Sequence, residues 1–263
     1  MAILAEMFSA SDPLHYLPAG AAEVLDLGCN TGQTLKVMLG LGVSRAYGVD
    51  INPLAVAAAQ RLNDPRVVVH QASADALPLA DHSVDFVLCS EVLEHVPEPL
   101  RPAAVAEIHR VLRPSGVLAL TVPHAGLFAG LDPANVRFRF PALYRRVSRF
   151  VGGASRDAGF ERQKHGVVWH HHFSVDELRG LLQGRFAIEH VRFRGAVLVP
   201  LCDALAFPFY RKRLYDHPVL KALLALSALD YRFDAGPLLG YDVLLVARRL
   251  GSSISRASGE EDD

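Results

Sequence analysis

The sequence has few cysteines, and their spacing matches neither a disulfide scaffold nor a metal site. Only three occur in 263 residues, far apart in the chain: Cys29, Cys89 and Cys202. This usage is typical of a reducing compartment, so we expect a cytoplasmic protein. Residues 1–10 also lack the positively charged start and the cleavage site of a secretory signal, and we expect a short helix there.

Long apolar runs are absent as well. None approaches the roughly 20 residues that a membrane-spanning helix needs. The two longest, residues 196–210 and 219–229, each contain a charge, Asp203 and Lys221 respectively. We therefore expect no transmembrane segment. Apolar residues still make up 51% of the chain and charged residues 21%, which is enough apolar material for one large domain or two small ones.

The chain also lacks a large excess of charge of one sign, because its net charge is −1. The charges are unevenly spread, however. Residues 1–134 carry 7 Lys or Arg and 14 Asp or Glu, residues 135–213 carry 15 and 6, and residues 214–263 carry 5 and 8. A basic middle favours an anionic partner, although neighbouring acidic residues in the fold would balance it equally well.

The most informative segment present is Glu-Val-Leu-Asp-Leu-Gly-Cys-Asn-Thr-Gly, residues 23–32. It reads as a short buried strand and a glycine-rich turn, followed by helical spacing from Thr34. Such a turn exposes backbone N–H groups to a ligand, and Asp26 suits an ammonium or hydroxyl group better than a phosphate. A dinucleotide fingerprint would place glycine at Asn30 and Gln33, so a nicotinamide dehydrogenase is disfavoured. Asn30 still tolerates left-handed backbone angles.

Further strand and helix patterns follow in regular order. The second strand ends in Asp50, about 20 residues after the glycine turn, the spacing at which an acidic residue meets ribose hydroxyls. The other expected elements are strands at 66–71, 84–89 and 117–122, a helix at 103–112, a turn at 113–116, and strands at 186–193 and 241–247. A capping box, Ser174 with Glu177, marks a helix start.

This succession resembles the class I S-adenosylmethionine-dependent methyltransferases, in particular the methyltransferase type 11 group. The resemblance covers about half the chain and is carried by the 26–32 loop, Asp50, and residues 75–78, 85–95 and 111–118. It implies an α/β fold: a Rossmann-like, doubly wound, seven-stranded sheet with an antiparallel last strand. Helical inserts would follow strands 5 and 6.

The resemblance also implies S-adenosyl-L-methionine as cofactor. Asp26 would orient its amino group, Asp50 would hold both ribose hydroxyls, and Asp75 with the Ala76 backbone would read the adenine edge. The full expected cofactor-binding set is Asp26, Gly28, Asn30, Gly32, Asp50, Ile51, Asp75, Ala76 and Ser90.

We expect one domain over residues 1–250, with a cofactor-binding core at 22–122, substrate inserts at 124–170 and 196–236, and a disordered tail at 251–263. Two interpretations of the second insert remain. Its apolar runs form a helical pair that packs on the sheet as a lid, or they form an interfacial element in lipid. In the second case, Arg211-Lys212-Arg213 would lie at the headgroups.

Methyl transfer from a sulfonium depends mainly on bringing the reactants together and excluding water. A hydroxyl acceptor would benefit from a general base, for which histidine is the usual choice. The candidates, in order of preference, are His124, then His170 or His172, then His95; a reaction without a base is also open. No third ligand accompanies His170 and His172, so no metal site is expected.

The expected activity is methylation at oxygen of a small-molecule, lipid-linked or glycan-linked acceptor, which the basic middle allows to be anionic. Peripheral contact with the inner membrane surface is part of this expectation. Cys89 follows leucine rather than proline, and the fourth strand lacks an Asn-Pro-Pro signature, so nucleic acid is not the expected substrate. An RNA methyltransferase and a non-catalytic cofactor-binding module are the alternatives.

Overall fold

The computed structural model describes residues 8–127, 129, 171–196, 198–211, 214 and 216–251. Its centre is a seven-stranded sheet of order β3-β2-β1-β4-β5-β7-β6. The strands are β1 (Glu23–Leu27), β2 (Arg45–Asp50), β3 (Val67–Gln71), β4 (Val84–Ser90), β5 (Leu112–Pro123), β6 (Phe186–Arg194) and β7 (Asp242–Arg249). Six strands run in the same direction, and β7, between β5 and β6, runs in the opposite direction. The predicted Rossmann-like sheet with an antiparallel last strand is therefore confirmed.

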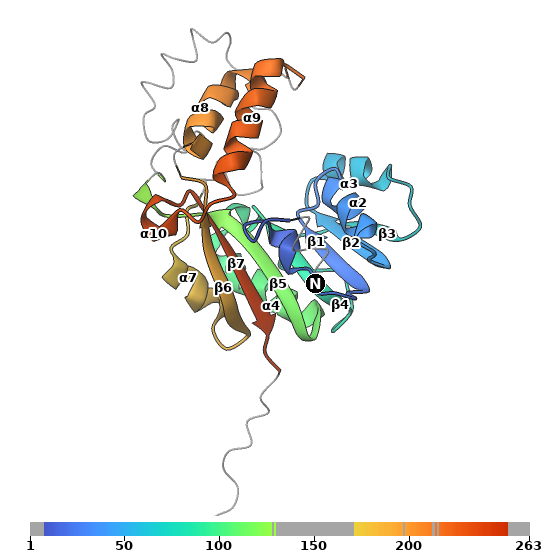
Figure 1. Ribbon diagram of the computed structural model, residues 1–263. Helices are drawn as coiled ribbons and strands as arrows, with labels where there is room; N and C mark the ends of the chain where they lie inside the picture. The colour runs from blue at the N-terminus through green and yellow to red at the C-terminus, as the bar shows by residue number, and fades with distance from the viewer. Residues whose placement is uncertain are drawn as a thin grey trace, which may run out of the picture.

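Helices cover both faces of this sheet (Figure 1). The described helices are α2 (Gln33–Gly40), α3 (Pro53–Gln60), α4 (Arg101–Val111), α7 (Val175–Leu182), α8 (Leu198–Arg211), α9 (Pro218–Asp230) and α10 (Gly236–Leu239), with short 3-10 turns η1 (Pro13–Tyr16), η2 (Leu93–His95) and η3 (Glu98–Leu100). Of these, α2, α3, α4 and α7 pack on the sheet. One apolar cluster joins the sheet to α4 and α7, and a second joins it to α2, α3 and η1. The sheet is therefore doubly wound.

The order of the strands reverses between β1 and β4, because β1 pairs with β2 on one side and with β4 on the other. In open α/β sheets, ligands bind outside the carboxyl ends of the strands at such a switch point. Asp50 ends β2 and Ser90 ends β4, while Asp26 precedes the last residue of β1. Three of the residues that sequence analysis singled out therefore share the edge of the sheet that is expected to bind a ligand.

Two local predictions need correction. The turn expected at residues 113–116 lies inside β5, which begins at Leu112 and accommodates the extra residues as a bulge opposite β4, with Ser115 at φ 64°. The capping box is only half formed. The Ser174 hydroxyl accepts from the Glu177 amide at 3.1 Å, but the Glu177 carboxylate turns to His171 at 2.8 Å.

The second insert forms the predicted helical pair, α8 and α9. Among the described residues these two helices contact mainly each other, and they stand beyond the end of β6 (Figure 1). The Asp230 carboxylate at the end of α9 caps the start of α8, accepting from the amides of Ala196, Leu198 and Val199 at 2.7 to 3.0 Å. The start of the insert and the end of α9 therefore meet at one point.

Several predictions fall wholly or partly on residues that the structure does not describe. These include most of the first insert, His170, residues 1–7 of the expected leading helix, and residues 252–263 of the tail. Residues 8–10 are not helical. Within the described ranges, no helix combines the length and apolar character needed to cross a membrane.

Candidate functional site

The loop after β1 is held in a conformation with three left-handed residues. Gly28, Asn30 and Gly32 have φ of 80°, 46° and 79°. Asn30 therefore adopts the angles that its side chain was predicted to tolerate. The amides of Gly28 and Cys29 both donate to the Val49 carbonyl, at 2.7 and 3.1 Å, which fixes the loop against the end of β2. A Cβ on Gly28 would clash with Val92 Cγ2, so a larger residue would displace its neighbour.

Asp26 is a buried carboxyl group with incomplete hydrogen bonding. Asp26 is only 4% exposed, and its Oδ2 oxygen has no hydrogen-bond partner in the described part of the chain. Burial, together with the charge of Asp50, raises the pKa of Asp26 to about 7. A buried carboxylate beside a second carboxylate is costly unless a cation accompanies it. The position therefore favours a positively charged group of a ligand.

Asp50 joins the glycine loop to the start of α3. Its Oδ2 accepts from the Asn30 amide at 2.9 Å and its Oδ1 accepts from the Asn52 amide at 2.8 Å. A carboxylate has about four acceptor positions, so each oxygen retains capacity for a ligand hydroxyl. Ile51, directly after it, is 56% exposed and offers an apolar surface beside the carboxylate.

Asp75 and Ala76 follow β3 on the same edge. The Asp75 Oδ1 oxygen accepts from the Ser73 hydroxyl, and the Ala76 amide donates to the Ser73 carbonyl at 3.1 Å. The Ala76 N–H group is therefore already engaged, which argues against its expected role in reading adenine. The half-buried Asp75 carboxylate keeps acceptor positions that are suited to an exocyclic amino group.

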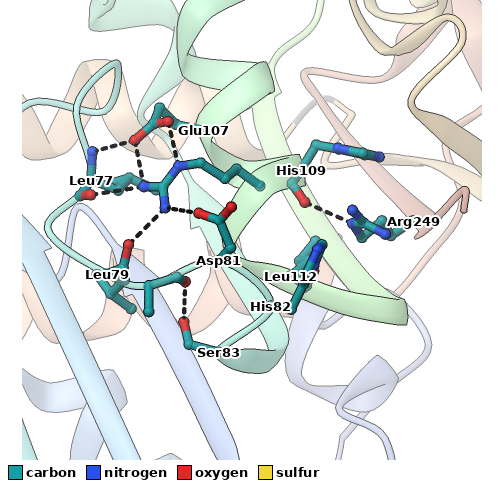
Figure 2. A network of polar contacts seen from close by, with 11 residues as sticks. Leu77, Leu79, Asp81, His82, Ser83, Glu107, His109, Leu112 and Arg249 are labelled. Atoms are coloured by element: carbon teal, nitrogen blue, oxygen red, sulfur yellow. Dashed lines mark hydrogen bonds and ion pairs between the residues drawn. The ribbon is translucent and has the colours of Figure 1, made fainter. Parts of the chain in front are cut away.

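One arginine, Arg110, organises the segment that follows Asp75. Figure 2 labels four of the residues in this network, Leu77, Leu79, Asp81 and Glu107. Arg110 on α4 donates from Nη2 to the Leu77 carbonyl at 2.9 Å and from Nη1 to the Leu79 carbonyl at 2.8 Å. Its remaining N–H groups bond to Glu107 and Asp81 at 2.7 to 2.8 Å. Glu107 also accepts from the Leu77 amide at 2.8 Å. The network uses the whole guanidinium fork, which a lysine cannot reproduce.

If Asp75 contacts the adenine of the cofactor that the sequence resemblance implies, Arg110→Lys should weaken binding of S-adenosylhomocysteine about tenfold and reduce its advantage over S-inosylhomocysteine. The single ammonium group cannot hold both carbonyls and both carboxylates, so the segment carrying Asp75 loses its fixed position. Calorimetric titration of both ligands measures the effect. Arg66→Lys is the matched control, because Arg66 makes an exposed pair with Asp64 at 2.7 Å. An unchanged ratio of the two affinities in Arg110→Lys would contradict this role.

Two carboxyl groups, those of Glu91 and Glu94, follow the end of β4. The sequence prediction, which considered histidines as the general base, did not include them. Thr121 donates its only hydroxyl proton to Glu91 Oε1 at 2.8 Å, so the Ser90 hydroxyl, 2.8 Å away, donates to Thr121. Glu91 is exposed and has a left-handed φ of 55°. Glu94 is 1% exposed, and burial with the charge of Glu91 raises the pKa of Glu94 well above its usual range. The signal in the sequence that could have identified this pair was Glu94, an acidic residue within an apolar stretch.

The structure changes the order of the histidine candidates. His124 is 6% exposed, and its Nδ1 and Nε2 atoms each lie 3.0 Å from a carbonyl oxygen, of Phe173 and Pro237 respectively. Both ring nitrogens are therefore already directed at backbone carbonyls, and the geometry favours a structural link between β5 and α10. His95 is partly exposed, with Nε2 3.7 Å from Glu94 Oε1, and His172 is half-buried.

The cysteines do not provide a nucleophile. All three are buried. Burial, with the charges of Asp26 and Asp50, raises the pKa of Cys29 to about 12, and burial raises that of Cys89 as well. In the ranges that the structure describes, no group of three or more His, Cys, Asp or Glu residues could hold a metal ion.

Comparison with known proteins gives a consistent result. Residues 25–120 match a family model described as a methyltransferase domain. An uncharacterized methyltransferase of Mycobacteroides abscessus is 37% identical over 149 residues, which cover 54% of this chain and 51% of that protein. A ubiquinone biosynthesis O-methyltransferase of Pseudomonas paraeruginosa is 32% identical over 154 residues, covering 52% of this chain and 64% of that protein.

The match to solved structures extends further along the chain. A putative sarcosine dimethylglycine methyltransferase from Galdieria sulphuraria aligns with a TM-score of 0.57 and 18% identity, covering 87% of this chain and 78% of that one. At this identity the likeness concerns the fold. The sequence match spans half to two thirds of the length of the two curated relatives. The chain therefore contains a methyltransferase domain, over residues 25–120, and has the fold of a solved methyltransferase.

Proposed function

We propose that this chain transfers a methyl group from S-adenosyl-L-methionine to a small-molecule acceptor. The observation that carries the proposal is Asp26, a buried carboxyl group with one oxygen that lacks a partner among the described residues. A second carboxylate, Asp50, lies 24 residues later in the chain and at the same edge of the sheet. A ligand bearing both an ammonium group and ribose hydroxyls complements this pair. The residues present therefore fit the cofactor, which, when bound, supplies the methyl group on its sulfonium.

Each part of the edge has a task in this proposal. Asp26 orients the ammonium group, Asp50 accepts hydrogen bonds from the ribose hydroxyls, and Asp75 accepts from the adenine amino group. Exposed Ile51 packs on the base. Left-handed Gly28, Asn30 and Gly32 let the backbone approach the ligand closely, and Ser90 lies near the reacting end. Holding the cofactor in one orientation removes much of the entropic cost of the reaction.

The acceptor is proposed to react through oxygen. Support comes from relatives named as ubiquinone biosynthesis O-methyltransferases, each aligned with about half of this chain. Glu91 is better placed than His124 to take the proton from a hydroxyl, because it is exposed and oriented by Thr121. A lipid- or glycan-linked acceptor suits the apolar second insert, and an anionic one suits the basic middle of the sequence. Nucleic acid is not the proposed acceptor.

A single domain over residues 1–250 is part of the same proposal. Its support is the continuous sheet, in which β6 and β7, separated in sequence from the first five strands, complete the edge next to β5.

The test combines binding with transfer. We expect both S-adenosylmethionine and S-adenosylhomocysteine to bind in calorimetry, and label from methyl-labelled cofactor to enter the lipid or small-molecule fraction of a bacterial extract. Asp50→Ala serves as the inactive control. Binding without transfer to any fraction would leave a cofactor-binding module, label in RNA would change the substrate class, and absence of binding at millimolar cofactor would overturn the proposal.

A further inference from the structure

Three hydrogen-bonded side chains connect the ends of β4 and β5. Ser90 ends β4 and pairs with Thr121 in the parallel register, so the two side chains lie on the same face of the sheet. Their hydroxyl oxygens are 2.8 Å apart, and Thr121 Oγ1 lies 2.8 Å from Glu91 Oε1. The Glu91 amide also donates to the Thr121 carbonyl at 3.0 Å. Glu91 is therefore held on β5 by both its backbone and its side chain.

The carboxylate gives this series of hydrogen bonds one direction. An ionised carboxylate only accepts, so the single hydroxyl proton of Thr121 points to Glu91, and Ser90 donates to Thr121. The Ser90 oxygen then has only acceptor capacity left. Burial and the charge of Glu91 raise the pKa of Glu94 well above its usual range, so this pair carries its proton on Glu94 and its negative charge on Glu91. The open end at Ser90 therefore binds only a group that brings a proton.

The exposure of the three residues fits a path for protons. Ser90 is half-buried, Thr121 is fully buried and Glu91 is exposed. The segment that follows Ser90 packs on the glycine loop, since a Cβ on Gly28 would clash with Val92. Ser90 thus borders the loop that is proposed to bind the cofactor, whereas Glu91 can release a proton to water.

The groups around Glu91 leave it as the proton acceptor of this cluster. The titratable residues that its charge affects are Glu94 on η2, Tyr231 after α9 and Cys89 on β4. Burial, with the charges of Asp242 and Glu91, raises the pKa of Tyr231, which donates to Asp242 Oδ2 at 2.6 Å. Burial raises the pKa of Cys89 as well. Within the described ranges, Glu91 is the exposed carboxylate of this cluster, whereas Glu94 and Asp242 are buried.

We propose that Ser90 contacts the reacting hydroxyl group of the acceptor and that Thr121 relays its proton to Glu91. This role rests on the proposed methyl transfer and narrows the substrate class. The reacting oxygen belongs to an alcohol or a phenol that still carries its proton, because a carboxylate or phosphate oxygen has no proton to donate to Ser90.

The relay balances atoms and charge. The acceptor oxygen forms a bond to the methyl carbon, and the bond from that carbon to sulfur breaks, leaving its electron pair on sulfur. One proton moves from the acceptor to Ser90, one from Ser90 to Thr121 and one from Thr121 to Glu91. The positive charge of the donor and the negative charge of Glu91 therefore disappear together.

Substitutions that keep or remove one hydroxyl separate the relay from packing. With methyl-labelled cofactor and the extract fraction that takes up label, we expect Thr121→Val and Ser90→Ala each to slow transfer about 100-fold. Thr121→Ser keeps the hydroxyl and should retain most of the wild-type rate. Ser83→Ala is the matched control, because the Ser83 hydroxyl donates to the Ala80 carbonyl at 2.7 Å before the start of β4. Thermal melting and calorimetric titration with S-adenosylhomocysteine verify that each variant is folded and binds cofactor.

The labelled product tests the substrate class. A methyl ether formed from an alcohol or a phenol resists alkali, whereas a methyl ester formed from a carboxylate releases labelled methanol. We expect label that is stable to alkali.

Nuclear magnetic resonance of the unliganded protein tests the direction of the hydrogen bonds without an acceptor. The buried Thr121 hydroxyl proton, bonded to a carboxylate, should give a separate downfield signal that is absent in Thr121→Val. Glu91→Gln should move this signal upfield, because a neutral amide oxygen is a weaker acceptor.

Four results would overturn the proposal. Wild-type rates in Thr121→Val and Ser90→Ala would exclude the relay and leave methyl transfer in place. Label released by alkali would exclude a hydroxyl acceptor. A Thr121 signal that does not respond to Glu91→Gln would mean that the hydrogen bonds run in the other direction. Wild-type protein that transfers no label to any fraction would remove the proposed function, and this role of Ser90 with it.

Discussion

Asp50→Ala is expected to weaken the binding of S-adenosylmethionine and S-adenosylhomocysteine by about 100-fold or more. A hydrogen bond to a charged group contributes about 1.5–3 kcal/mol, and the carboxylate is proposed to accept two from the ribose. The substitution also releases the amides of Asn30 and Asn52, so the glycine loop loses one of its anchors. Isothermal titration calorimetry of both ligands measures the loss.

The control for this prediction is Asp64→Ala, which removes an equally charged carboxylate from the turn before β3, at the opposite edge of the sheet. We expect it to leave both affinities within twofold of wild type. For S-adenosyl compounds that lack the ribose hydroxyls, the Asp50→Ala variant and the wild type should differ much less, because only the effect on the loop remains. A difference as large as the one for the intact ligands would mean that Asp50 acts through the loop instead of the ribose.

Asp26→Asn is expected to stabilise the unliganded protein while weakening cofactor binding. The folded pKa of Asp26 is about 7 against 3.8 for the free side chain. Between these values the unfolded chain releases a proton that the folded protein retains, so stability falls as pH rises, by up to about 4 kcal/mol above pH 7. Asparagine carries no charge and removes this penalty. Thermal unfolding at pH 8 should show a higher midpoint for the variant, with a much smaller difference at pH 5.

Binding gives the complementary readout. If the ammonium group requires the ionised Asp26 carboxylate, the affinity of the wild type should increase about tenfold for each unit by which the pH is raised towards 7, and should level off above pH 7. The affinity of the Asp26→Asn variant should lack this pH dependence. Asp85→Asn is the control, and it should lower the stability of the protein at pH 8, because the pKa of Asp85 is lowered in the folded protein. Burial alone would raise the pKa of Asp85, but its hydrogen bonds with Arg113 and the amides of Ala22 and Glu23 lower it. Equal destabilisation of both variants at pH 8 would contradict the prediction.

The features predictable from sequence are those that depend on neighbouring residues. The strands follow from short apolar runs, and the left-handed Asn30 follows from its place between two turn glycines. The half-formed capping box shows the limit of this reasoning. The Ser174 part is local and is present, whereas the Glu177 carboxylate turns to His171 and Arg101, and Arg101 lies on a different helix.

The candidate site divides in the same way. Asp26 and Asp50 were predictable because strand ends in a parallel sheet meet at one edge. The position of His124 was not, since the carbonyls around it come from Phe173 and Pro237, 49 and 113 residues away. The pairing of Glu91 with Thr121 likewise joins two strands across 30 residues. Sequence spacing alone carries no information about which distant groups satisfy a buried side chain.

The cap that Asp230 places on α8 has a consequence for how this protein can change over evolutionary time. Because one carboxylate ties the entrance of the insert to its exit, the distance that the flanking strands must bridge does not depend on how long the two helices are. Helices can be lengthened, exchanged or decorated beyond that junction without moving Asp26 or Asp50. Selection can thus act on one exchangeable unit, leaving the half of the chain that carries Asp26 and Asp50 undisturbed.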